Sequence, residues 1–203
     1  MAFARTWAEE LIAEWMQRKD YLVETGIPVP IRNGGGGRRE ADVVGARLGK
    51  DGLLDILHVE TGALLDQPTV ERIGQKFSVD VRRYIIARFK NRFGGRHNRV
   101  KHYTMRCVVT YPHERVANWK RWVAAIHRLN QYIKVSRLDD FIAQDVLSVL
   151  PKDREPMLPE GQWLLCLTAY LRSYSVCNFG NSAGQKPNNI RKSRKLEVAQ
   201  IPA

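Results

Sequence analysis

The sequence has few cysteines, few acidic residues relative to basic ones, and no long apolar run. Its 203 residues include three cysteines, Cys107, Cys166 and Cys177, which are odd in number and widely spaced. This spacing matches neither a zinc site nor a disulfide framework, and it favours a reducing, cytoplasmic location. No apolar run approaches the ~20 residues of a membrane span, so we expect no contact with a membrane. The first 16 residues carry three acids and lack a signal-peptide pattern.

The excess of basic residues is the main compositional feature. Lysine and arginine number 33 against 21 aspartates and glutamates, which gives a formal net charge of +12. Such a charge indicates a polyanionic partner, with nucleic acid as the first candidate. A basic protein without such a partner is the alternative. The 44% of hydrophobic residues suffices for a core, and the length is that of one ordinary domain.

Apolar periodicity and turn residues divide the chain into alternating helices and strands. We expect helices at 7–19, 69–90, 113–130, 137–149 and within 160–176, and strands at 21–30, 41–48, 53–60, 103–110 and 132–135. This order predicts an α/β domain with a mixed central sheet flanked by helices. We expect a core domain at 1–150, a helical extension packed on it at 151–177, and a basic, disordered tail at 178–203.

A predicted hairpin brings two acidic residues together. Residues 50–52 form a three-residue loop ending in glycine, a common connection between antiparallel strands. Counting outward from this loop places Asp42 directly opposite Glu60, with Cβ atoms about 5 Å apart. Two opposed anions repel, whereas a hard cation such as Mg²⁺ between them would bind both. A metal site is therefore one interpretation. The other is that Asp42 caps the entry to its strand, while Glu60 reaches solvent or meets an arginine such as Arg38 or Arg39.

The arrangement of these acids resembles the PD-(D/E)XK nuclease superfamily. The shared features are an acid-bearing first helix, a glycine-rich approach at 34–37 to the strand of Asp42, a hairpin, and Glu60 on the next strand. The segment 9–24 is similar to the opening helix and strand of Mrr-like members. The resemblance covers roughly residues 7–150. It implies a restriction-endonuclease-like α-β-β-β-α-β core and a DNA endonuclease that hydrolyses phosphodiester bonds with Mg²⁺ or Mn²⁺.

The same resemblance implies roles for individual residues. Asp42 and Glu60 would bind the metal, and the carbonyl of Thr61 would add an oxygen ligand. Glu9 would be the first-helix carboxylate that helps to organise the metal site. Glu10 and Glu14 on the same helix are weaker candidates for this role.

One position departs from the family pattern. The family usually has a lysine two residues after the glutamate, where this chain has Gly62. Lys76 on the following helix is the nearest replacement, although the helical wheel places it off the apolar stripe and favours a solvent-facing lysine. The alternative is a catalytically degenerate relative that binds nucleic acid or a protein. A third hypothesis is an unrelated α/β domain whose acids pair with arginines.

Basic residues outside this site are candidates for phosphate contacts without sequence readout. They precede the strand of Asp42 or lie on the long helix and in the basic loop at 90–101 that follows it: Arg38, Arg39, Arg83, Arg92, Arg96, Arg99 and Lys101. A solvated surface is the alternative for each of them. His58 shares a face with Glu60, and a buried core histidine is the favoured interpretation. A homodimer would fit if both strands of a duplex are cut.

Overall fold

The structure is a computed structural model that describes residues 6–31, 40–63, 67–94, 99–110, 116–150 and 161–173. Within these ranges, five strands form one sheet in the order β1-β2-β3-β4-β5. The strands are β1 (Leu22–Pro28), β2 (Glu40–Leu48), β3 (Leu54–Gly62), β4 (Val100–Val109) and β5 (Ile133–Arg137). Strands β1 to β3 pair antiparallel, whereas β4 pairs parallel with both β3 and β5. The sheet is therefore mixed, as predicted.

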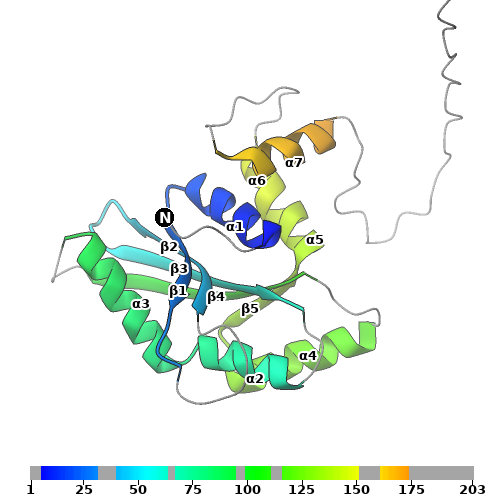
Figure 1. The fold of residues 1–203 in the computed structure, drawn as a ribbon, viewed down its shortest axis with the longest axis horizontal. Coiled ribbons are helices and arrows are strands. Elements are labelled where there is room, and N and C mark those ends of the chain that lie inside the picture. Colours follow the sequence, from blue (N-terminus) through cyan, green and yellow to red (C-terminus); the bar gives the residue numbers. More distant parts are fainter. Residues whose placement is uncertain are drawn as a thin grey trace, which may run out of the picture.

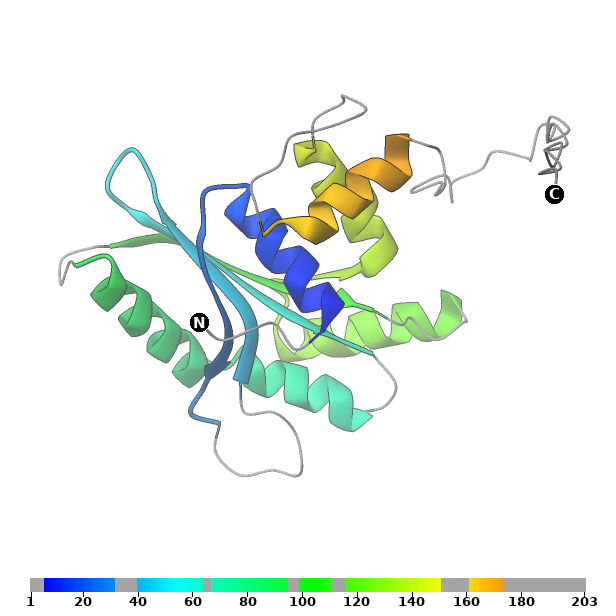
Figure 2. The same ribbon diagram turned by 45° about the horizontal axis from the view of Figure 1, so that its top comes forward.

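Helices cover both faces of this sheet (Figures 1 and 2). On one side lie α1 (Trp7–Gln17), α5 (Leu138–Phe141), the π-helical turn Ile142–Val146, α6 (Leu147–Val149) and α7 (Trp163–Ser173). On the other side lie α2 (Gln67–Lys76), α3 (Val79–Arg92) and α4 (Val116–Leu129). The predicted α/β class is thus confirmed. None of the described helices combines the length and apolarity needed to cross a membrane.

The hairpin between β2 and β3 has the predicted register. The Gly49 N–H donates to the Leu53 carbonyl at 2.8 Å, and Gly52 has φ 71°. Glycine suits this position because a left-handed backbone carries no steric cost without a Cβ. Pairing continues to Val43 opposite Val59, so Asp42 and Glu60 follow at the end of the ladder.

Alternation along the strands divides the core between the two faces. Val43 and Val59 belong to the core beneath α1 and α5 to α7. Val44 and Ile56 belong to the core beneath α3, and a third cluster joins α2 and α4 to β4 and β5. Between the hairpin and the Val43–Val59 pair, even-numbered residues of β2 and β3 therefore face α3. Contacts with Lys76 of α2 place Asp42 and Glu60 on the same side.

The single helix predicted at 69–90 is wrong, because the chain forms two helices there. Helix α2 ends at Lys76 and α3 begins at Val79. Ser78 is the N-cap of α3, and its Oγ accepts the Val81 N–H at 3.4 Å. A serine side chain that satisfies a free N–H of the first turn favours a new helix start at this point. Phe77 between the two helices is buried.

Glu14 ties α7 to α1. Its buried carboxylate accepts the N–H groups of Leu164 at 3.2 Å and Leu165 at 2.8 Å. Burial raises the pKa of Glu14, and these two hydrogen bonds act in the opposite direction. The carboxylate thus satisfies free donors at the first turn of α7, where negative charge is also favoured by the helix dipole. Glu14 is accordingly a helix cap, and the weaker metal role considered for it is wrong.

Candidate active site

The backbone of each strand holds the acidic side chain of the other where β2 and β3 stop pairing. The Asp42 N–H donates to Glu60 Oε1 at 3.3 Å, and the Thr61 N–H donates to Asp42 Oδ2 at 2.8 Å. Asp42 and Glu60 are both buried. The end of the ladder therefore fixes the two carboxylates side by side, in the register that the hairpin predicts.

Lys76 lies between these carboxylates. Its Nζ is 2.7 Å from Asp42 Oδ1 and also contacts Glu60 Oε2, and only 14% of the side chain is exposed. The favoured expectation of a solvent-facing lysine is therefore wrong. Because α2 ends at Lys76, one turn after the buried Ile73, the side chain lies at the flank of the apolar stripe and its stem reaches the sheet.

The two carboxylates divide their oxygens in the same way. Asp42 Oδ2 and Glu60 Oε1 accept hydrogen bonds from the protein backbone or from His58. Asp42 Oδ1 and Glu60 Oε2 both turn to the Lys76 ammonium. One oxygen of each acid is thus held by protein donors. The other oxygen of each acid contacts the Lys76 ammonium.

His58 anchors Glu60 from behind. Its Nε2 lies 2.6 Å from Glu60 Oε1, and its Nδ1 lies 3.0 Å from the Tyr103 hydroxyl. Burial, followed by the charge of Lys76, lowers the pKa of His58 to about 3, so the ring is neutral at pH 7. A carboxylate only accepts hydrogen bonds, so we assign the proton to Nε2 and let the Tyr103 hydroxyl donate to Nδ1. The favoured interpretation of a core histidine is confirmed, and this histidine also orients Glu60.

Burial disfavours the ionised forms of both acids in the site. Burial, and then the neighbouring Glu60, raises the pKa of Asp42 to about 6. Burial also raises the pKa of Glu60, against the opposing effect of Lys76. Burial lowers the pKa of Lys76, but Glu60 and Asp42 outweigh it and leave the pKa raised. Two buried carboxyl groups therefore share one ammonium beside a neutral imidazole.

A pocket of about 540 Å³ opens onto the carboxylates. Glu9 is buried and lines this pocket from α1, which packs on the other face of the sheet. In the described part of the chain, no three His, Cys, Asp or Glu side chains are grouped to hold one metal. The organising role expected for Glu9 stays a prediction. Thr61 lines the pocket and donates its N–H to Asp42; a ligand role for its carbonyl stays a prediction.

Two pocket residues on α2 were missed from the sequence. Thr69 and Arg72 precede Lys76 by seven and four residues, so all three lie along one face of the helix and line the pocket. Arg72 is exposed, and its guanidinium donates to Thr69 Oγ1 at 3.1 Å. The spacing itself was a usable signal, because one helical face carrying a lysine and an arginine offers two cations to one site.

The predicted phosphate-contacting residues that the structure describes lie away from this pocket. Lys101 follows the Leu54–Val100 pair at the start of β4, whereas Glu60 pairs with Cys107 near its end. Arg99 precedes β4 at that same far end and is exposed.

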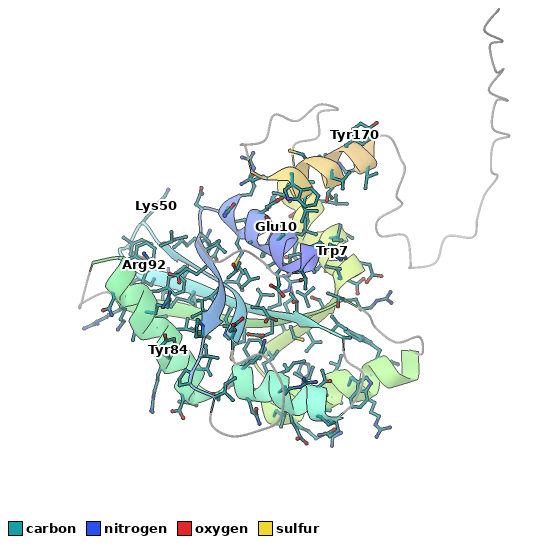
Figure 3. All side chains as sticks on the ribbon, in the orientation of Figure 1. Trp7, Glu10, Lys50, Tyr84, Arg92 and Tyr170 are labelled. Carbon is teal, nitrogen blue, oxygen red and sulfur yellow. The ribbon has the colours of Figure 1, made fainter. Side chains whose placement is uncertain are left out.

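Two of the predicted contacts belong to α3. Arg92, at the end of the helix, pairs with Glu24 at 3.1 Å, and Arg83 is exposed. Figure 3 shows Arg92 and Lys50 well apart from Trp7, which lines the pocket. The remaining candidates, Arg38, Arg39 and Arg96, fall outside the described residues. The tail predicted at 178–203 also falls outside them.

The carboxylates of Asp42 and Glu60 fit a hard divalent cation whose other coordination positions are taken by water or substrate. Mg²⁺ is commonly held by one or two carboxylates together with waters and substrate phosphate oxygens. Asp42 and Glu60 supply two carboxylates whose converging oxygens already face one cation, the Lys76 ammonium. Two buried carboxyl groups beside a single lysine favour a further positive charge at the mouth of the pocket.

Comparisons of the chain with family models, with curated proteins and with solved structures find no match. The function must therefore be inferred from the chemistry of the described residues. Among these, a lysine is shared by two buried carboxylates at the end of a β-ladder.

Proposed function

We propose that this chain is a metal-dependent nuclease with a restriction-endonuclease-like core that hydrolyses phosphodiester bonds of DNA. The observation that carries the proposal is the convergence of Asp42, Glu60 and Lys76 on one point. The element order supports it, since α1, three antiparallel strands, the α2–α3 pair and the parallel strand β4 follow one another as the resemblance implies. Lys76 of α2 would take the place of the lysine that the family usually has at the position of Gly62.

Asp42 and Glu60 would hold Mg²⁺ or Mn²⁺. When bound, such a cation polarises the scissile phosphate and lowers the pKa of a coordinated water. The backbone N–H groups of Asp42 and Thr61, with His58, keep both carboxylates oriented whether or not a cation is present. A site held in this way loses little conformational entropy when it binds.

Lys76 would stabilise the negative charge that develops on the phosphate. Its raised pKa keeps the amine protonated at pH 7, so we assign it electrostatic stabilisation and no role as a base. Arg72, one turn earlier on α2, lines the pocket and would contact a neighbouring phosphate. The basic residues at the far end of the sheet would add only non-specific, salt-sensitive affinity.

One observation favours a second function, a nuclease-like protein that binds nucleic acid without cutting it. Lys76 already contacts both carboxylates, so the three groups satisfy one another in the absence of any metal. In such a protein the ion pairs would be purely structural. Cleavage, and its dependence on metal, separates the two functions.

The test is cleavage of supercoiled plasmid and linear DNA in Mg²⁺, Mn²⁺ or EDTA. The wild type should nick DNA with either metal and not in EDTA. Asp42→Asn and Glu60→Gln should lose at least ~10³-fold in rate, because the metal contributes several kcal/mol to the transition state. Asp51→Asn, an exposed acid at the hairpin, is the matched control and should keep full activity. Metal-dependent nicking that survives in both site variants would contradict the proposal.

A further inference from the structure

An exposed tryptophan stands at the rim of the pocket. Trp7 begins α1, lines the pocket together with Asp42 and Lys76, and is 51% exposed. Among the described residues, no ring and no cation stacks against its indole. Trp15 on the same helix is buried, with Phe141 packed edge-on at 4.9 Å. Trp7 therefore presents a free aromatic surface where the other tryptophan of α1 has a partner.

The two walls of the pocket offer different chemistry. Trp7 comes from α1 on one side of the sheet, and Arg72 and Lys76 come from α2 on the other side (Figure 1). One wall thus carries an aromatic side chain beside Glu9, and the other carries two cations. A volume of about 540 Å³ lies within the range of sites that accept a molecule of nucleotide size. A nucleotide has the matching pair of groups, a flat base and an anionic phosphate.

An aromatic side chain stacks on the face of a base, and inside a duplex the neighbouring bases cover these faces. Indole rings stack on bases of single strands, loops and ends, where the faces are open. Resting on the proposed nuclease function, we propose that Trp7 stacks on an unpaired nucleotide next to the scissile phosphate. The preferred substrate is then nucleic acid with a single-stranded segment, such as a flap or a free strand. A continuous duplex would be the poorer ligand.

Binding tests this inference separately from cleavage. Fluorescence anisotropy in EDTA would measure the affinity for a labelled single strand, the matching duplex, and that duplex carrying a single-stranded flap. The wild type should prefer the strand and the flap over the duplex. Trp7→Ala should weaken binding to both unpaired ligands about tenfold and leave duplex binding unchanged, because one stacked base contributes on that order. Trp7→Phe should lie between the two proteins.

Trp163→Ala is the matched control. Trp163 is 56% exposed, lies on α7 and does not line the pocket, so its loss should change no affinity. Thermal unfolding of each variant checks that the fold is kept. Equal affinities of Trp7→Ala and wild type for the flap, or an equal loss on the duplex, would overturn the inference while leaving the nuclease proposal intact. A wild type that binds none of the three ligands would overturn both.

Discussion

The two ends of the central sheet carry ion pairs of opposite character. At the hairpin end, Lys101 pairs with Asp51 at 2.9 Å, and their side chains are 48% and 42% exposed. At the other end, Lys76 pairs with Asp42 at 2.7 Å, and the exposed fractions are 14% and 6%. The hairpin pair matches one acid with one base. The buried group sets two acids, Asp42 and Glu60, against one lysine.

This contrast separates solvated charge from charge that is held in place. An exposed pair gains little, because water and salt screen it and both side chains lose freedom. Buried acids cost desolvation energy, and an unmatched one also raises the pKa of its neighbour, as for Asp42. A fold that keeps such a group gives up stability at that point, which is typical of functional sites. The four predictions below test this difference between the two ends.

Lysine replacement should give the largest difference. Lys76→Ala should lower the rate of metal-dependent cleavage by about 10²–10³-fold, the usual loss when a charge-stabilising donor is removed. Lys101→Ala should leave the rate unchanged, because Lys101 lies at the hairpin end. Single-turnover cleavage of a labelled substrate measures both, with circular dichroism to check the fold. Equal rates for the two variants would remove the distinction between the ends.

Replacing the acids should change stability in opposite directions. The folded-state pKa of Asp42, about 6, lies above its ordinary 3.8, so its contribution is complete below 3.8 and is lost as pH rises to 6. This loss amounts to about 3 kcal/mol. Asp42→Asn should therefore be more stable than the wild type at pH 7. Lys101 lowers the pKa of Asp51, so Asp51→Asn should be slightly less stable.

Urea unfolding between pH 4 and pH 8 measures the free energy of unfolding of the wild type, Asp42→Asn and Asp51→Asn. His58 acts in the opposite sense, since its pKa of about 3 lies below its ordinary 6.5 and stability falls as pH drops through that window. The difference between wild type and Asp42→Asn removes most of this background. A difference that stays constant from pH 4 to pH 8 would contradict the account of a strained buried acid.

Replacing His58, which donates to Glu60, should impair cleavage less than replacing Asp42, Glu60 or Lys76. His58→Phe removes the donor to Glu60 Oε1, so the Mg²⁺ concentration for half-maximal cleavage should rise ten- to a hundredfold. His58→Gln, which keeps a donor, should recover part of this loss. Tyr103→Phe, one hydrogen bond further out, should have a smaller effect. An unchanged Mg²⁺ requirement in His58→Phe would show that the imidazole only fills the core.

Replacing Glu14, a second buried glutamate, should have the smallest effect. This variant tests whether a buried acid must belong to the active site. Glu14→Ala should lower the free energy of unfolding by about 1 kcal/mol, because the N–H groups of Leu164 and Leu165 lose their acceptor. Cleavage should stay at the wild-type rate, unlike that of Glu60→Gln. Urea unfolding and the plasmid assay measure the two quantities. A loss of cleavage as large as that of Glu60→Gln would mean that Glu14 acts in the site.

The local part of the site followed from the sequence. A three-residue loop ending in Gly52 sets the hairpin register, and register alone brings Asp42 opposite Glu60. The α/β class followed from the alternation of periodic segments. Parallel pairing of β3 with β4 places Arg99 and Lys101 at the far end of the sheet, and the abundance of basic residues alone does not indicate this position.

Contacts between distant segments did not follow from the sequence. One helical wheel drawn over 69–90 misplaced Lys76, because the cap at Ser78 ends one helix and starts another. The partners of Glu14 lie about 150 positions further along, and no local pattern indicates that α7 starts beside it. Tertiary packing decided both positions, where local periodicity had no information.

The most direct test of the central claim is a count of bound Mn²⁺ by electron paramagnetic resonance. Mn²⁺ would be titrated into the wild type, into the double variant Asp42→Asn/Glu60→Gln, and into Asp51→Asn. We predict one bound ion per chain in the wild type and in Asp51→Asn, and none in the double variant. The same binding in all three proteins, or none in any of them, would contradict a metal site at the end of the β2–β3 ladder and would leave Lys76 as a purely structural partner.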